Sequence, residues 1–244
     1  MSYVSEFRQI ISQTKKILDA EKDSGIELPP IKEPEAEVEY TKAVIDSSPA
    51  PAKLSDLRTE LGDCTRCKLC NGRKNIVFGE GAENARLMFI GEGPGEDEDI
   101  AGRPFVGKAG ELLTSIIENG IKIKREEVYI CNIVKCRPPA NRDPEKEEIN
   151  TCIPFLKKQI EIIKPRVICT LGRIAARELL KRDFKITMER GRWQTYLNIP
   201  LMPTYHPAYI LRNPGNERKL KGEVWQDIQK IMSLLGIEVK KNDG

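Results

Sequence analysis

Short apolar runs alternate with amphipathic segments along most of this chain, and this alternation restricts its fold more than any other feature. Four runs are expected to form buried strands: 87–90, 128–134, 167–171 and 201–204. Four longer segments with helical spacing are expected to form helices: 108–119, 144–164, 173–181 and 220–235. Strands separated by helices predict a parallel sheet covered on both faces. In such a sheet, ligands bind at the carboxyl edge of the strands.

The first 52 residues differ from the rest. Apolar residues over 2–22 have helical spacing, whereas 23–52 are rich in Pro, Glu, Ala and Ser and predict a flexible acidic linker. We therefore expect a folded domain over 53–244. Residues 1–50 carry ten acidic and six basic side chains, so the remainder holds a net charge of about +7 within a total of +3. A modestly basic body is compatible with nucleic-acid binding but does not establish it.

Composition suits a protein that folds in water, with 39% hydrophobic and 32% charged residues. No stretch reaches the ~18–20 continuous apolar residues that a membrane span needs, and the N-terminus shows no secretory signal. We expect a cytoplasmic location and no membrane partner. The seven cysteines are then expected to be reduced thiols or metal ligands rather than disulfides.

Four cysteines have a spacing that predicts a metal centre. Cys64 and Cys67 form a Cys-x-x-Cys pair, Cys136 follows after 68 intervening residues, and Cys152 after fifteen more. By ligand type, four thiolates suit structural zinc and an iron–sulfur cluster equally well. Cys70 leaves a second ligand set open.

The first expected strand leads into a glycine-rich acidic segment, GEGPGEDEDIAGRPFVGKAG (91–110). Its glycines let the backbone approach a ligand closely. Glu96 stands where a dinucleotide fingerprint needs its third glycine, and no Gly-Lys-Ser/Thr phosphate loop follows. The segment could be a solvated acidic turn, or a carboxylate on it could position a water or stabilise a developing cation.

Three other side chains are candidates for ligand contact. His206, the only histidine, follows an expected strand and could donate a hydrogen bond to a leaving-group oxygen. Asn132 offers a paired donor and acceptor that match the edge of a pyrimidine. Phe105 could stack on a flipped base. A purely structural role is the alternative for each.

Taken together, these segments resemble the family 4 uracil-DNA glycosylases, the iron–sulfur branch of their superfamily. The matching pieces, in order between about residues 54 and 236, are CTRC, GEGPGEDED, GRPFVGKAG, VYICNIVKCRPPANR and PTYHPAYILRNP. The resemblance implies a three-layer α/β/α sandwich with a central four-stranded parallel sheet. It also implies a [4Fe-4S] cluster on Cys64, Cys67, Cys136 and Cys152; Cys70 departs from the family pattern. The implied reaction is hydrolysis of the bond between uracil and deoxyribose in DNA, which leaves an abasic site for base excision repair.

The resemblance further implies a uracil pocket. Phe105 stacks on the base, Asn132 reads its edge and His206 contacts O2. The residues expected to contact uracil are Glu92, Gly93, Pro94, Phe105, Asn132 and His206.

Two carboxylates are candidates for positioning the water that attacks the sugar. Better-known glycosylases of the superfamily carry Asp where this chain has Gly93. Glu92 is therefore the favoured catalytic carboxylate, with Glu98 second, and Glu98 could instead fix the loop.

DNA contacts are expected on both sides of this pocket. Around Cys136 the candidates for phosphate binding are Lys135, Arg137 and Arg142, and Arg212 and Asn213 follow the histidine segment. Leu211 is the expected wedge that enters the duplex when a base is flipped.

We expect a monomer that acts on uracil-containing DNA, and the N-terminal tail could bind a replication or repair protein. Two alternatives remain at this level: a metal-stapled nucleic-acid-binding module without catalysis, and a redox-sensing or electron-transfer protein.

Overall fold

The computed structural model describes residues 53–238. Four parallel strands form the centre of a sheet with the order β1-β3-β2-β4-β6-β5. They are β2 (Leu87–Gly91), β3 (Tyr129–Asn132), β4 (Val167–Leu171) and β6 (Ile199–Thr204). The predicted four-stranded parallel sheet is confirmed. The helix predicted over 2–22, the linker over 23–52 and the domain boundary between them and the body lie outside the described residues.

Two short antiparallel strands were not predicted. β1 (Glu80–Gly81) pairs with β3, and β5 (Gln194–Tyr196) pairs with β6. Strands of two and three residues are too short to show a period-two pattern. β5 and β6 are joined by Leu197 and Asn198, whose φ angles of 48° and 64° are those of a primed hairpin turn.

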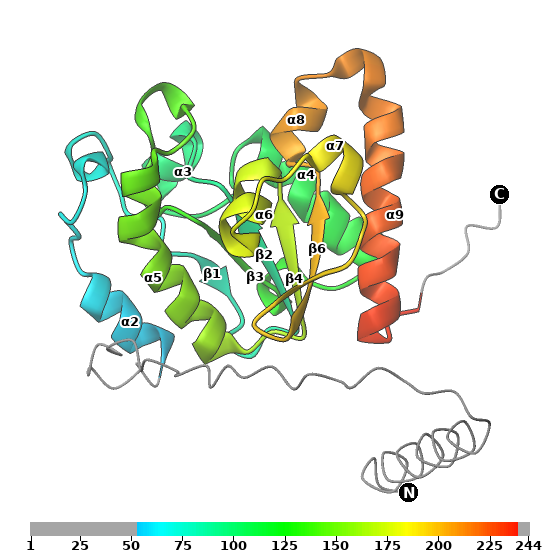
Figure 1. The fold of residues 1–244 in the computed structure, drawn as a ribbon, viewed down its shortest axis with the longest axis horizontal. Coiled ribbons are helices and arrows are strands. Elements are labelled where there is room, and N and C mark those ends of the chain that lie inside the picture. Colours follow the sequence, from blue (N-terminus) through cyan, green and yellow to red (C-terminus); the bar gives the residue numbers. More distant parts are fainter. Residues whose placement is uncertain (1–52, 239–244) are drawn as a thin grey trace, which may run out of the picture. The chain divides into compact units, whose positions relative to one another are not determined.

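Helices cover both faces of the sheet, as predicted (Figure 1). One layer holds α2 (Leu54–Leu61), α5 (Lys146–Ile163) and α6 (Arg173–Leu180). The other holds α4 (Lys108–Ser115), which continues as a π-helical turn over Ile116–Ile121, with α8 (Pro207–Leu211) and α9 (Glu217–Leu235). Short α3 (Glu96–Ala101) and α7 (Ile186–Glu189) lie in connections.

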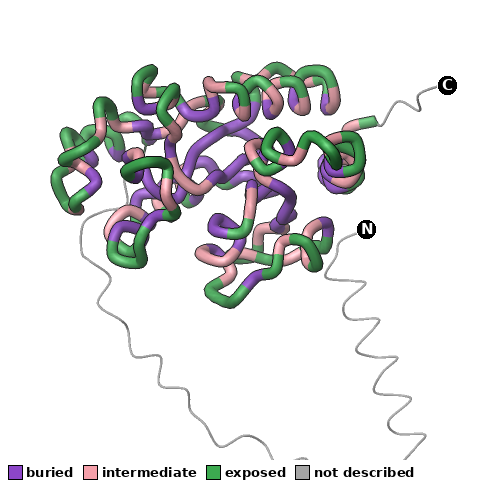
Figure 2. The backbone as a smooth tube through the Cα atoms, turned by 90° about the horizontal axis from the view of Figure 1, so that it is seen from above, coloured by how far each residue is buried: buried purple, intermediate pink, exposed green. Residues whose placement is uncertain are grey.

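Alternation along the strands divides the core between the two layers. In β2, Met88 and Ile90 pack toward α5, whereas Leu87 and Phe89 pack toward α9. The buried residues accordingly run through the middle of the molecule in Figure 2. The three-layer α/β/α sandwich is confirmed. Among the described helices, none combines the length and apolar content needed to span a bilayer.

Candidate active site

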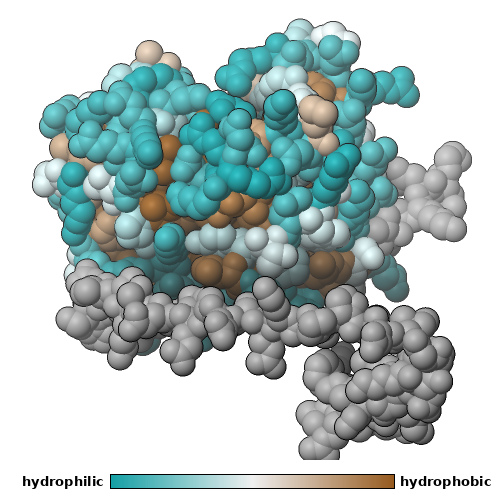
Figure 3. Space-filling model, in the orientation of Figure 1, coloured by the Kyte–Doolittle hydropathy of each residue, from teal (hydrophilic) through white to brown (hydrophobic). Residues whose placement is uncertain are grey.

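A cavity of about 440 Å³ lies at the carboxyl edge of the parallel strands. Space-filling Figure 3 shows this top edge notched between two lobes of largely hydrophilic surface. The cavity walls include every residue predicted to contact uracil: Glu92, Gly93, Pro94, Phe105, Asn132 and His206. Glu98, Arg142 and Arg212 also line it, whereas Arg137 and Leu211 do not. The sheet topology thus brings together side chains that are more than a hundred residues apart in the sequence.

His206 caps the start of α8 with its ring. Its Nδ1 accepts a hydrogen bond from the backbone N–H of Ala208 at 3.1 Å. Burial, with the charge of Arg212 adding to it, lowers the pKa of His206 to about 4. At neutral pH the imidazole is therefore uncharged, and because Nδ1 accepts, its single proton is on Nε2. The ring presents a neutral N–H donor to the cavity.

Phe105 closes the apolar side of the cavity in an unusual backbone conformation. Its φ of 51° is left-handed, which costs energy for an aromatic residue. Two glycines make room for it: a Cβ on Gly110 would lie 1.8 Å from the Phe105 carbonyl oxygen, and one on Gly91 would lie 2.7 Å from Cζ of its ring. A side chain at either glycine would therefore collide with Phe105 in this conformation.

Asn132, the last residue of β3, is buried with an unpaired acceptor. Its exposed fraction is 1%, and Oδ1 has no hydrogen-bond partner among the described residues. An unpaired buried polar atom is costly, and such atoms are rare in proteins. Because Asn132 lines the cavity, a ligand with an N–H donor would satisfy it.

Glu92 is the carboxyl group of the site whose proton affinity is most altered. Burial, with a smaller contribution from nearby Asp143, raises its pKa to about 7, against the opposing charges of Arg173 and Arg212. A carboxyl group that titrates near neutral pH has the proton affinity expected of a general base.

The Glu98 side chain lies against the backbone of its own glycine-rich segment (91–110). Its Oε1 accepts from the backbone N–H of Gly107 at a long 3.5 Å, and a Cβ on Gly95 would lie 2.7 Å from its Oε2. The neighbouring Asp99, which sequence reasoning missed, is 1% exposed and accepts the backbone N–H groups of Lys74 and Asn75. Nothing in the acidic run GEDEDI distinguishes Asp99 from its neighbours, because only the fold turns it inward.

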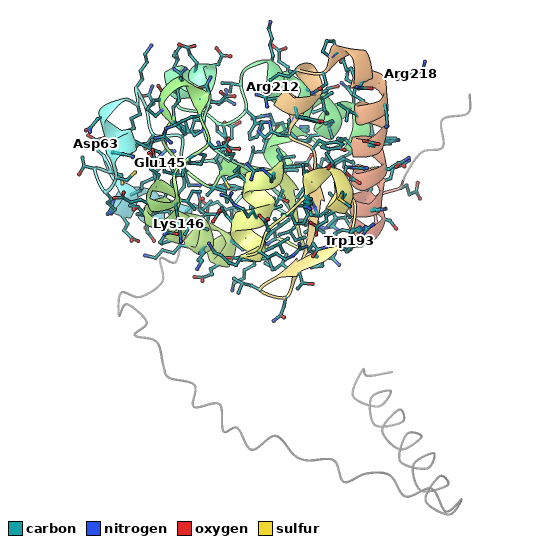
Figure 4. The ribbon with its side chains drawn as sticks, turned by 45° about the horizontal axis from the view of Figure 1, so that its top comes forward. Asp63, Glu145, Lys146, Trp193, Arg212 and Arg218 are labelled. Carbon is teal, nitrogen blue, oxygen red and sulfur yellow. The ribbon has the colours of Figure 1, made fainter. Side chains whose placement is uncertain are left out.

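The arginines that are predicted to contact DNA differ in whether another side chain already binds them. Arg212 lines the cavity just after α8, where Figure 4 labels it, and is exposed. Arg142 forms a two-pronged bond with buried Glu148, at 2.9 and 2.6 Å. Arg137 bonds Asn141 at 2.8 Å. Leu211 is 39% exposed, as a wedge must be.

Lys135 was expected among the phosphate contacts, and that expectation is wrong. It is 1% exposed, and its ammonium donates to the Asn132 carbonyl at 2.8 Å and to Gln159 Oε1 at 2.7 Å. An ammonium that is buried and held by two protein oxygens cannot reach the DNA backbone.

Several further cavity residues carried no signal in the sequence. Arg173 pairs with Asp143 at 3.0 Å, and both line the cavity. Tyr205 and Tyr209 line it too, with ring centroids 5.2 Å apart. Tyr205 precedes the histidine and Tyr209 follows it in the sequence, and the turn into α8 places both at the cavity.

The four predicted ligand cysteines line one narrow cavity together. Cys64, Cys67, Cys136 and Cys152 share it, whereas Cys70 does not line it and its Sγ points to its neighbour Asn71 at 3.4 Å. Burial raises the pKa of Cys136 to about 11 and raises that of Cys152. These groups are therefore thiols at neutral pH unless a cation holds them as thiolates.

The surroundings of these cysteines supply hydrogen-bond donors to two of their sulfur atoms. The guanidinium of Arg73 donates to Cys136 Sγ at 3.4 Å and the backbone N–H of Lys135 donates to Cys152 Sγ at 3.3 Å, contacts that tune cluster thiolates. Arg73 is itself held by Asp63, labelled in Figure 4. No three described His, Cys, Asp or Glu side chains converge closely enough to hold one metal ion.

One family model and several known proteins match this chain. The family model described as "Uracil DNA glycosylase superfamily" matches residues 78–229. The chain is 47% identical over 191 residues to the Type-4 uracil-DNA glycosylase of Saccharolobus solfataricus, covering 75% of this chain and 86% of that protein. It is 50% identical over 175 residues to the Type-4 uracil-DNA glycosylase of Thermotoga maritima, covering 70% and 89%.

Proposed function

Because this chain belongs to the uracil-DNA glycosylase superfamily, we propose that it excises uracil from DNA. The reaction is hydrolysis of the N-glycosidic bond, which leaves an abasic site. The glycosylase relatives favour this enzyme activity over a binding module without catalysis and over a redox sensor.

The unpaired Oδ1 of Asn132 is the observation that carries the proposal. In uracil, the N3–H donor lies beside a carbonyl acceptor, and an asparagine amide presents the complementary acceptor and donor. Phe105 would stack on the ring of the flipped base. A side chain at position 91 is excluded by both residues, since its Cβ would lie 2.4 Å from Asn132 Oδ1 and 2.7 Å from Phe105 Cζ.

His206 would supply the donor for the leaving group. Breaking the bond puts negative charge on uracil and positive charge on the sugar. A neutral imidazole with its proton on Nε2 can donate to uracil O2 as that charge develops. The ring needs no reorganisation, because the bond from Ala208 N–H to Nδ1 already fixes its orientation.

Glu92 is the proposed catalytic carboxylate. Once ionised, it can orient a water toward C1′ and offset the charge of the sugar cation. Glu98 is assigned the supporting role, since the hydrogen bond that it accepts from the Gly107 backbone would hold the loop. Gly93 and Pro94 then form the wall beside the base.

Incubation of the purified protein with a uracil-containing oligonucleotide, followed by alkaline cleavage, tests the activity. Strand cleavage at the uracil position is expected, and none at thymine in the matched oligonucleotide. An intact uracil strand after prolonged incubation with folded, iron-replete protein would refute the proposal.

We also propose that Cys64, Cys67, Cys136 and Cys152 hold a [4Fe-4S] cluster. A bound cluster would tie the segment after α2 to the segment after β3 and to α5. Visible absorption together with iron and zinc analysis of purified protein tests this. About four irons and no zinc are expected per chain, and a colourless zinc protein would refute the cluster.

DNA is the proposed macromolecular partner inside the cell. Arg212, Arg137 and Arg142 would contact phosphates, and Leu211 would fill the gap left by the flipped base. We propose that the protein acts as a monomer. A repair or replication protein remains the proposed partner of residues 1–52.

A further inference from the structure

Lys135 is the one residue whose described contacts reach both the cysteine centre and the uracil cavity. Its backbone N–H donates to Cys152 Sγ at 3.3 Å, and the residue lines the cysteine cavity. Its ammonium donates to the backbone carbonyl of Asn132 at 2.8 Å. The segment that follows β3 lines both cavities, with Asn132 and Pro138 at the uracil cavity and Cys136 at the cysteine cavity.

The position of this ammonium is tightly specified. Its second acceptor, Gln159 Oε1, lies at 2.7 Å. The amide of Gln159 cannot be reversed, because its Nε2 donates to the Phe78 carbonyl at 2.9 Å and to the Tyr129 hydroxyl at 3.0 Å. The amide oxygen of Gln159 therefore faces the Lys135 ammonium. The ammonium in turn fixes the backbone carbonyl of Asn132.

The charge of Lys135 lacks a carboxylate partner. Among the described residues it forms hydrogen bonds only to neutral oxygens, and no ion pair includes it. A buried charge is costly unless an opposite charge compensates for it. The group able to do so nearby is the negative charge of the four thiolates once they hold a cluster, since Lys135 lines their cavity.

We propose that Lys135 is a positioning residue that couples the cysteine centre to the uracil pocket. It would serve as counter-charge to the ligated cysteines and, through the Asn132 carbonyl, fix the amide that reads the base. The effect of Lys135 on uracil binding rests on the proposed function, and its effect on the cluster rests on the proposed cluster. Neither effect depends on the rate of the reaction.

Lys135→Met tests the coupling, because it keeps the length of the side chain and removes both its charge and its hydrogen bonds. Lys158→Met is the matched control: it removes the same charge from α5, where Lys158 pairs with Glu60 at 2.7 Å on the surface. Circular dichroism and thermal unfolding establish that each variant is folded. If Lys135→Met does not fold, Lys135→Gln takes its place.

Two readouts besides activity are measured on iron-replete full-length protein: the affinity for free uracil by calorimetry, and the midpoint potential of the cluster by voltammetry. We expect uracil affinity to fall about tenfold, the value of one well-placed hydrogen bond. We expect the midpoint potential to become more negative, because a nearby cation stabilises the reduced cluster. Lys158→Met should change neither.

A folded Lys135 variant with an unchanged potential and unchanged uracil affinity would overturn the coupling, as would a shift in only one of the two. Failure of the proposed function looks different: the wild-type protein would neither bind uracil nor cleave the uracil oligonucleotide. A wild-type protein without iron would also overturn the coupling.

Discussion

The rings of Phe105 and His206 face each other with their centroids 5.4 Å apart and their planes inclined by 31°. One follows β2 and the other caps α8 after β6, so the contact joins two loops at the carboxyl edge of the sheet. Gly172, between β4 and α6, lies behind it, since a Cβ there would be 3.1 Å from His206 Cβ. A stacking surface and a neutral donor thus meet at one wall of the cavity.

Replacing His206 should separate catalysis from folding. His206→Ala and His206→Asn should each lower the single-turnover rate of uracil release by about 100–1,000-fold, because one preorganised donor to the developing anion is lost. Asparagine is a good N-cap and alanine a poor one, so only the alanine variant should lose about 1 kcal/mol of stability. Quench-flow and urea unfolding measure the two effects. Full activity in either variant would remove His206 from the mechanism.

The pH dependence should follow Glu92. Its pKa of about 7 means that the ionised form disappears as pH falls through neutrality, so the single-turnover rate should drop on the acid side. His206, with a pKa of about 4, stays neutral over this range and adds no second limb. In Glu92→Gln the acid limb should vanish along with most of the activity. A limb that persists in this variant would assign it to another group.

Glu92 should also make the protein less stable at high pH. Because its pKa is raised in the folded state above the ordinary 4.5, the folded protein binds this proton more tightly than the unfolded chain. That contribution to stability is fully present below about pH 4.5 and is lost as pH rises through about 7. Glu92→Gln, which cannot ionise, should therefore unfold at a higher temperature than the wild type at pH 8. Equal melting temperatures there would contradict the burial of Glu92.

Gly91→Ala should damage the pocket without unfolding the protein. Its added Cβ would lie 2.4 Å from Asn132 Oδ1 and 2.7 Å from the Phe105 ring, so these two residues must move apart and uracil binding should be lost. Gly222→Ala is the control, because nothing lies within 4 Å of a Cβ there. In the interior of α9 it should stabilise by about 0.5–1 kcal/mol. Calorimetry with uracil and thermal unfolding compare the two.

Cysteine substitutions should show which cysteines bind the cluster and which do not. Cys136→Ser should lose iron and the visible absorption band, since its sulfur lines the shared cavity, whereas Cys70→Ser should keep both. Iron analysis after purification under nitrogen measures this. Loss of iron from Cys70→Ser alone would give Cys70 the ligand position.

Arginine substitutions should separate DNA contact from stability. Arg212→Ala should weaken DNA binding and reduce the slope of log affinity against log salt by about one. Arg142→Ala should weaken DNA binding and, unlike Arg212→Ala, should also lower stability, because it leaves buried Glu148 without its two-pronged partner. Fluorescence anisotropy over a salt series and urea unfolding provide the readouts. Identical salt slopes for the wild type and Arg212→Ala would exclude a phosphate contact at Arg212.

The sequence by itself determined the four parallel strands, the flanking helices and the six residues expected to contact uracil, all of which line the cavity. Both kinds of information are local: apolar runs show the period of buried strands and helices, and the site residues follow strand ends within a few positions. The helix predicted to begin at Pro144 in fact begins at Lys146, because Glu145 and Glu148 form a capping box there. Such boundaries depend on individual hydrogen bonds that hydrophobic periodicity does not register.

Only the tertiary structure decided how these residues behave. Lys135 lies among basic residues in the sequence, yet it is buried because the strand end turns its side chain toward Gln159, 24 residues away. Asp99 becomes a loop anchor, Cys70 does not line the cavity that Cys64 and Cys67 share, and Glu92 has a pKa near 7 through burial. Exposure, charge environment and hydrogen-bond partners depend on which distant segments pack together. Those contacts are made across the sheet and cannot be read from neighbours along the chain.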